Sequence, residues 1–66
     1  MQLAEQAYRQ AIALDPQLAE AYKGLGLVQY RLGKKAEART AFEHYLQLQP
    51  QAKDRDQIKE YLVELS

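Results

Sequence analysis

The sequence contains no cysteine and no tryptophan, and its 66 residues include one histidine and two prolines. Without cysteine the chain has no disulfide framework and no thiol nucleophile. The histidine, His44, makes neither a zinc site nor a catalytic triad by itself, and we expect it to be a solvated surface residue. A domain this small buries about 60% of the surface of its unfolded chain, which leaves little room for an enclosed active site. We therefore expect no catalysis, no cofactor and no metal.

An excess of charge of either sign is also absent, since nine Lys and Arg balance nine Asp and Glu. No overall field attracts the chain to nucleic acid or to an anionic membrane. The first residues contain no basic leader followed by an apolar block, and no run approaches the roughly 18 apolar residues of a membrane span. We expect neither nucleic acid nor a membrane as a partner. A small helical nucleic-acid-binding domain, such as a helix-turn-helix, is the alternative class.

Residues that favour strands are few, and residues that favour helices make up most of the chain. The β-branched residues are Ile12, Val28, Thr40, Ile58 and Val63. The pattern predicts an all-α fold with four helices, at about residues 2–14, 18–32 and 35–48 and from Asp54 toward the C-terminus. The connections between them are short, which predicts antiparallel neighbours.

Local signals mark where these helices begin and end. Pro16 and Pro50 each follow a helical pattern and stop it. Gly33 stands where a left-handed C-terminal cap is expected, directly before two lysines that suit the negative end of the helix dipole. Asp54 is a good N-cap, and Gln57 three residues later resembles a capping box.

The first and third predicted helices repeat one another. When residues 4–16 are placed over residues 38–50, at an offset of 34, both segments have Ala, Ala, Leu and Pro at the same places. In addition, Tyr8 falls on Phe42, and Ile12 falls on Leu46. The same offset relates nothing in the second and fourth helices, because Tyr22 would fall on Asp56. We therefore interpret residues 53–66 as a capping helix outside the repeat.

The repeated pattern resembles the tetratricopeptide repeat. Residues 19–52 are similar to one whole repeat, with signature residues at Tyr22, Leu25, Gly26, Gly33, Ala38, Phe42, Leu46, Leu48 and Pro50. Residues 1–16 resemble the second helix of a preceding repeat. The chain departs from the pattern at Gln29, where an aromatic is usual, at Arg39 in place of an aliphatic residue, and at Tyr45 in place of a small one. The resemblance implies a fragment of an α-solenoid, built as a single domain over residues 1–66 from antiparallel helix-turn-helix repeats.

Two glycines inside the second helix need an explanation, since a glycine in a helix interior costs about 0.5–1 kcal/mol relative to alanine. A phosphate-binding loop would need a third glycine where Gln29 stands, and a strand before the loop, and both are missing. The resemblance implies instead that Gly26 lets the paired helix approach at Ala38. Gly24 has no such role in the family, and we expect it to be tolerated on a more exposed face.

Two further groups are expected to be structural. The basic residues around the turn between the second and third helices are interpreted as a solvated helix junction; they are Arg31, Lys34, Lys35 and Arg39. The aromatic residues at repeat-related positions are expected to lie in the core; they are Tyr8, Tyr22, Phe42 and Tyr45.

The resemblance implies that function lies on the inner face of the helical repeat. On the second helix this face should present Glu20, Lys23, Leu27, Tyr30 and Arg31. This mixture of charged, aromatic and aliphatic side chains suits a helix or an extended peptide. Some relatives clamp a C-terminal carboxylate, but Leu27 stands where they need asparagine, so that clamp is not expected. The predicted function is a non-catalytic scaffold that binds a protein or peptide.

The first helix keeps an apolar face with no preceding helix to cover it. Its apolar residues are Leu3, Ala7, Ile12 and Leu14. Repeats contact their neighbours, and about three are usually needed for a stable array. We infer either a piece of a longer array or a chain that completes itself by association. The second interpretation predicts a homodimer through this face.

Overall fold

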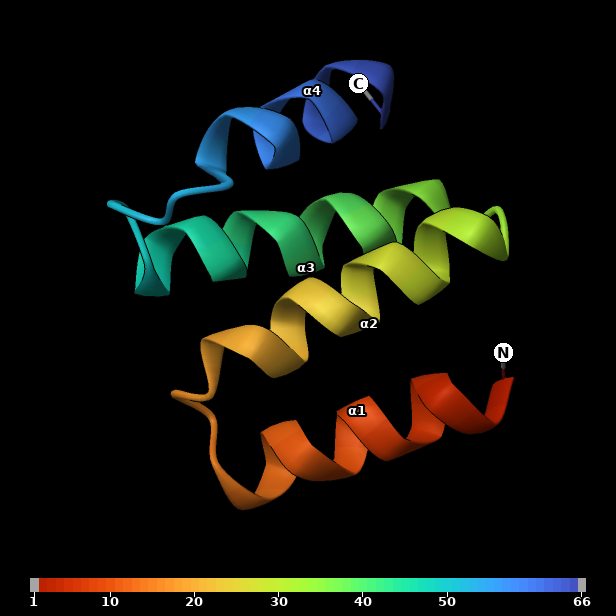
Figure 1. Cartoon of the computed structure of the whole chain (residues 1–66). Helices are drawn as coiled ribbons and strands as arrows, with labels where there is room; N and C mark the ends of the chain where they lie inside the picture. The colour runs from red at the N-terminus through yellow and green to blue at the C-terminus, as the bar shows by residue number, and fades with distance from the viewer. Residues whose placement is uncertain (1, 66) are drawn as a thin grey trace.

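The computed structural model describes residues 2–65, which form four α-helices and no strand. The helices are Gln2–Leu14 (α1), Ala19–Arg31 (α2), Lys35–Leu48 (α3) and Arg55–Leu65 (α4). They lie side by side in chain order, with α1 at one edge of the molecule and α4 at the other (Figure 1). Each helix packs against the one that follows it. The predicted all-α fold of helical repeats is confirmed.

The boundaries follow the local signals closely. α1 ends at Leu14, directly before Asp15 and Pro16, and α2 is one residue shorter at each end than predicted. Gly33 has a φ of 81°, as its position after α2 predicts. The Gly33 N–H donates to the carbonyl of Tyr30, and the Lys34 N–H donates to the carbonyl of Gln29. This pair of bonds is the Schellman arrangement that ends helices at glycine.

Asp54 directly precedes α4, as predicted for an N-cap, and its carbonyl accepts the hydrogen bond from the Ile58 N–H. Its carboxylate serves a different purpose from the expected capping box. One oxygen accepts a hydrogen bond from the Tyr45 hydroxyl at 2.7 Å, and the other forms an ion pair with Lys23. Asp54 therefore joins the start of α4 to both helices of the preceding pair.

The core lies between α2, α3 and α4. Phe42 and Ile58 are the largest fully buried side chains, and the Phe42 ring stacks on Tyr61 of α4 at 5.3 Å between ring centroids. Tyr45 is also buried, so two of the four expected core aromatics, Phe42 and Tyr45, lie in the core. The other two, Tyr8 and Tyr22, are half-buried.

The two helical glycines both face aromatic rings. A Cβ built on Gly26 would lie 2.8 Å from two ring atoms of Phe42 on α3, so Gly26 lets the paired helix approach, and its nearest neighbour is this ring. A Cβ on Gly24 would lie 2.3 to 2.7 Å from the ring and hydroxyl of Tyr8. Gly24 was wrongly expected to be free of such a contact. It makes room for an aromatic side chain of α1.

Most of the apolar face of α1 is open to solvent. Leu3 and Leu14 are 80% and 88% exposed, and Ala7 is exposed as well. Ile12 is half-buried and turns toward the groove between α1 and α3, so it does not share the exposed face. Within the described residues, no helix has the length and apolar character needed to cross a membrane.

Candidate functional site

The five residues predicted for the inner face lie along one side of α2. Glu20, Lys23, Leu27 and Arg31 follow one another at spacings of three and four residues, and Tyr30 lies beside them, three residues after Leu27. Glu20 and Arg31 at the two ends are exposed. Between them Lys23, Leu27 and Tyr30 are half-buried. We call this row the α2 face. Because helical periodicity also sets Tyr22, Leu25 and Gln29 on the other side of α2, the α2 face points away from the groove between α1 and α3.

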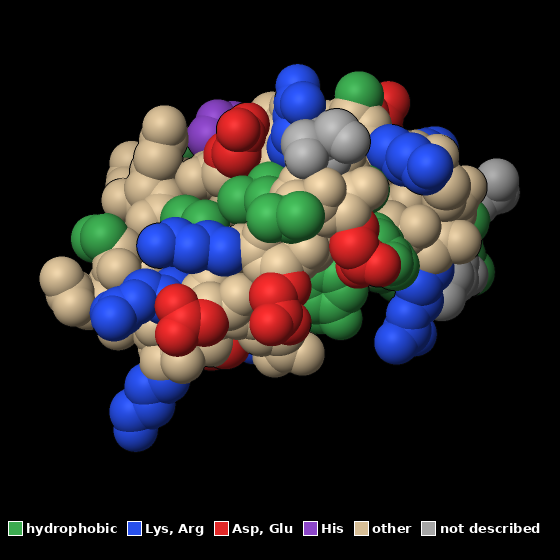
Figure 2. All heavy atoms as spheres, turned by 90° about the horizontal axis from the view of Figure 1, so that it is seen from above, with side chains coloured by type: hydrophobic (Ala, Val, Ile, Leu, Met, Phe, Trp, Pro, Cys, Tyr) green, Lys and Arg blue, Asp and Glu red, His purple; other side chains and the backbone are tan. Residues whose placement is uncertain are grey.

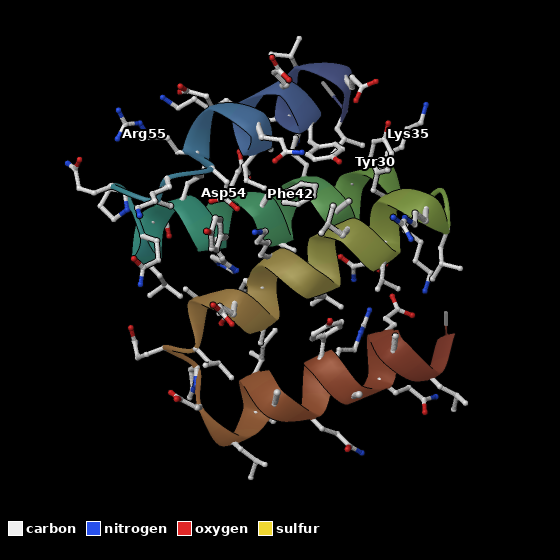
Figure 3. The ribbon with its side chains drawn as sticks, viewed as in Figure 1. Tyr30, Lys35, Phe42, Asp54 and Arg55 are labelled. Carbon is white, nitrogen blue, oxygen red and sulfur yellow. The ribbon has the colours of Figure 1, made fainter. Side chains whose placement is uncertain are left out.

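α4 borders the α2 face along one side. Lys23 forms its ion pair with Asp54, and its Nζ lies 6.0 Å from the centroid of the Tyr45 ring. Tyr30 donates a hydrogen bond to Glu64 at 3.1 Å (Figure 3). Its ring also meets the ring of Tyr61 edge-on, with 5.1 Å between centroids. Tyr30 therefore packs against the core, and Lys23 holds the start of α4 through its ion pair.

Two hollows open at the ends of the α2 face. Leu27 and Arg31 line a hollow of about 200 Å³ together with Tyr8, Gly24 and Val28. Gly24 shapes this hollow, because it lets Tyr8 lie against α2. At the other end, a larger hollow of about 470 Å³ is lined by Ala19, Glu20, Tyr45, Gln49, Ala52, Lys53 and Asp54.

The charges of the α2 face are distributed unevenly. Lys23 is neutralised by Asp54, whereas Glu20 and Arg31 form no ion pair with any other described residue. Hydrogen bonds from Lys23 and Tyr45 hold the pKa of the Asp54 carboxyl below its usual range. Burial, followed by the hydrogen bond to Asp54, raises the pKa of Tyr45 to about 12. The α2 face thus has a negative end at Glu20 and a positive end at Arg31.

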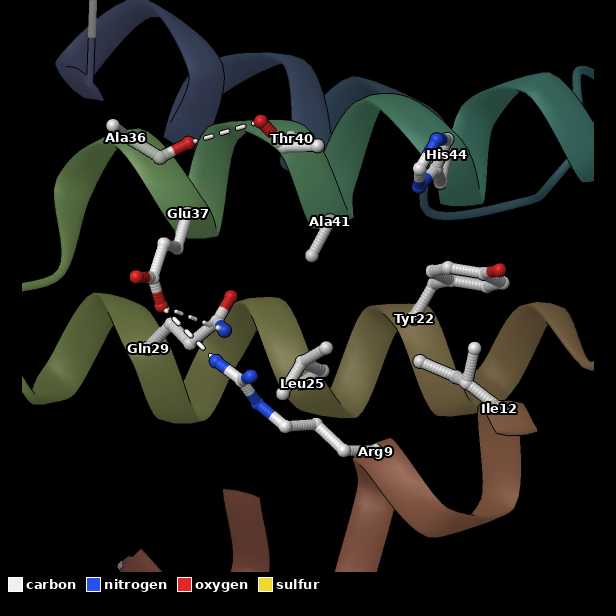
Figure 4. A pocket seen from close by; sticks show the side chains of 10 residues that line it. All are labelled: Arg9, Ile12, Tyr22, Leu25, Gln29, Ala36, Glu37, Thr40, Ala41 and His44. Carbon is white, nitrogen blue, oxygen red and sulfur yellow. Dashed lines mark hydrogen bonds and ion pairs between the residues drawn. The ribbon is translucent and has the colours of Figure 1, made fainter. Parts of the chain in front are cut away.

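A third hollow, of about 500 Å³, lies on the opposite side of α2 between α1 and α3 (Figure 4). Its lining residues are Arg9, Ile12, Tyr22, Leu25, Gln29, Ala36, Glu37, Thr40, Ala41 and His44. Arg9 crosses one end to form an ion pair with Glu37 at 3.3 Å. At the other end the exposed His44 meets the ring of Tyr22 edge-on, with 5.0 Å between centroids.

A buried carboxylate anchors α1 beside this groove. Glu5 is 6% exposed, and both of its oxygens accept hydrogen bonds from Lys34, at 2.9 and 3.0 Å. Gln29 and Arg9 donate to the same carboxylate at 3.3 and 3.4 Å. The Lys34 hydrogen bond is the largest of the effects that lower the pKa of Glu5, while burial opposes it. The four basic residues of the junction are exposed, as predicted, but Lys34 also pairs across helices, a contact that the prediction did not include.

Gln29 joins this network through its amide nitrogen, while its amide oxygen makes no hydrogen bond with the described residues. Its side-chain N–H groups donate to Glu5 and to Glu37, both at 3.3 Å, and the residue is 3% exposed. Its amide oxygen is buried and has no hydrogen-bond partner among the described residues. The two carboxylates fix this orientation, because a flipped amide would point its oxygen at both of them.

Sequence reasoning missed the roles of Glu5 and Gln29 in this network, although each residue carried a signal. Glu5 is a charged residue three positions before Tyr8 and seven before Ile12, which places it on the buried side of α1. Gln29 is polar where the repeat pattern usually has an aromatic. No group of three or more His, Cys, Asp or Glu residues able to hold a metal occurs in the described part of the chain.

Comparison with known proteins agrees with the residue pattern. A family model described as tetratricopeptide repeat matches residues 1–63, nearly the whole length of the chain. No curated protein and no solved structure gave a match. The family match includes α1, α2, α3 and α4 as far as Val63. It therefore extends beyond residues 19–52, the segment that resembles one whole repeat.

Proposed function

Because this chain belongs to the tetratricopeptide repeat family, we propose that it binds an extended peptide segment of a partner protein on the α2 face. The family is in general one of protein–protein interaction scaffolds, and its repeats are typically non-catalytic. The observation that carries the proposal is the pair of exposed charges, Glu20 and Arg31, at the two ends of one helix face, which form no ion pair within residues 2–65. An apolar stretch around Leu27 separates them.

The spacing of these charges defines the chemistry of the peptide. Glu20 and Arg31 are 11 positions apart on α2, which is about 16 Å along a helix. An extended peptide covers that distance with about five residues. The best ligand has a basic side chain near Glu20, an aliphatic side chain over the hollow at Leu27, and an acidic side chain near Arg31.

Short test peptides with blocked ends can examine this assignment. The first carries Lys and Glu at its two ends with a central Leu, and two others carry Lys at both ends or Glu at both ends. We expect the mixed peptide to bind the intact chain best, with amide shifts in an NMR titration concentrated on α2 around Leu27. Binding should weaken as salt rises, because the end contacts are exposed ion pairs.

A charge reversal gives a sharper test than loss of binding. Glu20→Arg makes both ends of the α2 face positive, so this variant should come to prefer the peptide with Glu at both ends. The matched control is Glu43→Arg, an exposed position on α3, which should leave the preference for the mixed peptide unchanged. An unchanged preference in Glu20→Arg, or shifts centred on another helix, would show that the peptide site is elsewhere.

A further inference from the structure

The groove between α1 and α3 is built from three consecutive helices. α1 provides one wall, α2 provides the floor, and α3 provides the other wall. The volume of the groove, about 500 Å³, lies within the range of roughly 300–1,000 Å³ that is usual for ligand pockets. Because α1, α2 and α3 provide all of its lining residues, its shape depends on no segment outside these helices.

The middle of the groove is apolar. Leu25 and Ala41 lie there and are 8% and 3% exposed, and the half-buried Ile12 and Tyr22 lie toward the end where Tyr22 meets His44 (Figure 4). At the α4 edge of the molecule, by contrast, charges of both signs are interspersed over the surface (Figure 2). A flat aromatic group in the groove therefore contacts aliphatic and aromatic side chains.

A buried hydrogen-bond acceptor lies at the other end of the groove, which we call the polar end. Gln29 is 3% exposed, and its amide oxygen has no hydrogen-bond partner among the described residues. The Gln29 side chain lines the groove and points from α2 into the space between α2 and α3, beside Glu37 (Figure 4). A buried carbonyl oxygen without a donor is costly, so a ligand that donates to it stabilises the complex.

The other polar groups of the polar end already have partners. Arg9 donates to Glu5 and Glu37, the Gln29 amide nitrogen donates to the same two carboxylates, and the Thr40 hydroxyl donates to a backbone carbonyl. The charges of Arg9 and Glu37 offset one another, so this pair adds no net charge that would attract an ion. The group that this end accommodates is consequently a neutral donor.

We propose that the groove between α1 and α3 binds a tryptophan side chain of a partner protein, whose indole N–H donates to the Gln29 amide oxygen. Indole is an aromatic ring with one donor and no acceptor, whereas phenylalanine has no donor and the tyrosine hydroxyl is also an acceptor. Leu25 precedes Gln29 by four positions, about 6 Å along α2, so a ring over Leu25 brings its N–H edge to Gln29. Tryptophan is also enriched among the residues that dominate protein interfaces.

The Arg9–Glu37 ion pair opens to admit the ring. This pair spans the polar end beside Gln29, and its two side chains are 55% and 53% exposed (Figure 4). Exposed ion pairs contribute little to stability, so the pair separates at small cost and uncovers the amide oxygen. Arg9 keeps its contact with Glu5 when it does so.

Two probes of nearly equal shape test the hydrogen bond on the unmodified chain. The first is N-acetyltryptophan amide, and the second is the benzothiophene analogue, in which sulfur replaces the indole N–H. We expect the tryptophan probe to bind about three- to tenfold more tightly, the effect of one hydrogen bond. In NMR titrations the amide shifts should centre on Leu25 and Ala41. Equal affinities for the two probes would overturn the proposal, as would shifts centred on the α2 face.

A variant without the acceptor gives the matched test. Gln29→Met removes the amide oxygen, so this variant should bind the two probes equally. The control is Gln57→Met, an exposed position on α4, which should keep the preference for the tryptophan probe. Circular dichroism checks that both variants keep their helices. A preference that persists in Gln29→Met would contradict the proposal, because the indole donor would then have another acceptor.

Free indole distinguishes a side-chain site from a small-molecule site. Ala36, Thr40 and His44 are exposed along the α3 wall, which leaves that side open for the backbone that carries the ring. N-acetyltryptophan amide should therefore bind at least as tightly as free indole. Since the 66 residues contain no tryptophan, the fluorescence of the indole ring measures both affinities directly. Tighter binding of free indole would contradict the assignment to a partner protein.

Discussion

The ammonium group of Lys34 lies 2.9 Å from a carboxylate oxygen of Glu5, and this contact connects α1 to the turn between α2 and α3. Lys34 directly follows the left-handed Gly33, so the backbone of the turn delivers the lysine to its partner. Glu5 in turn is buried and receives hydrogen bonds from Gln29 and Arg9. This polar cluster therefore holds α1 against the body together with the ring of Tyr8, which lies over Gly24.

Two paired carboxylates, Glu5 and Asp54, make the stability of the chain depend on pH in the acid range. The pKa of Glu5 is lowered by Lys34, and that of Asp54 is lowered by Lys23, so both carboxylates stabilise the fold above their unfolded pKa values of about 4. That stability is lost as the pH falls through the lower pKa values of the folded state. The melting temperature should be constant near neutral pH and fall below about pH 4.5.

Glu5→Gln should lower the melting temperature at pH 7 and reduce its further decrease toward pH 3, because the variant has one fewer carboxylate to protonate. Circular dichroism melts across this range measure both effects. The control is Glu60→Gln, an exposed carboxylate of α4, which should follow the unmodified chain. Equal acid sensitivity in Glu5→Gln and the unmodified chain would show that Glu5 is not a source of it.

The ring of Tyr8 over Gly24 predicts a coupling between α1 and α2. Gly24→Ala improves helix propensity by about 0.5–1 kcal/mol but places a methyl group within 2.3 Å of the ring carbon that bears the hydroxyl. We expect a net loss of about 1 kcal/mol in the free energy of unfolding, since the half-buried ring can move partly aside. In a Tyr8→Ala background the same change should stabilise the chain.

A double-mutant cycle of Tyr8→Ala and Gly24→Ala, followed by urea unfolding, measures this coupling. Gly26→Ala is the matched comparison, and it should cost more, about 2 kcal/mol, because the Phe42 ring that it meets is fully buried. Additive effects of Tyr8→Ala and Gly24→Ala would mean that the ring does not occupy the space above Gly24.

Substitutions on the α2 face should distinguish the residues that stabilise the fold from those that bind the peptide. Tyr30→Ala removes the contacts with Tyr61 and Glu64 and should cost about 1–3 kcal/mol of folding free energy, whereas Lys23→Ala loses one ion pair and should cost about 1 kcal/mol or less. Arg31→Ala should change stability by less than about 0.5 kcal/mol, because Arg31 is exposed and forms no ion pair with a described residue.

Thermal melts of the three variants, combined with the peptide titrations, decide the assignment. Arg31→Ala should weaken binding of the mixed peptide at nearly unchanged melting temperature. If Arg31→Ala instead melts as low as Tyr30→Ala, the two residues share a structural role and the division is wrong.

The parts of the fold that were predictable are those fixed by the local backbone. Pro16 and Pro50 restrict φ and ψ of their own and the preceding residues, and Gly33 permits the left-handed conformation that ends α2. These residues mark helix ends without knowledge of the remaining chain. The offset of 34 between α1 and α3 also depends on sequence alone, and it identified the repeat that the family match supports.

Errors arose where distances between helices decide the outcome. Whether Gly24 faces solvent or Tyr8 depends on the angle at which α1 crosses α2, and spacing along the chain does not contain that angle. Likewise, Ile12 lies in the helical period of the apolar residues of α1, but it turns toward the groove and away from Leu3 and Leu14. The partner of Lys34 is 29 positions away and comes from another helix.

Gln29 provides the last test, because it is a polar residue at an otherwise aromatic position. Gln29→Met removes two hydrogen bonds but also removes the buried, unpartnered amide oxygen. Glu5 keeps Lys34, and Glu37 keeps Arg9, so neither carboxylate is left alone. The free energy of unfolding should therefore change by less than about 1 kcal/mol.

Gln29→Glu has almost the same shape as the native residue but the opposite consequence. It places a third carboxylate 3.3 Å from the positions of Glu5 and Glu37, where the native amide donates to both. Like charges in a buried cluster repel strongly, and we expect a loss of about 2 kcal/mol or more at pH 7. Protonation of the new carboxyl relieves the repulsion, so the deficit relative to Gln29→Met should shrink as the pH falls from 7 to 5. Urea unfolding at the two pH values measures it, and a deficit that does not change with pH would place Gln29 outside the contact with these carboxylates.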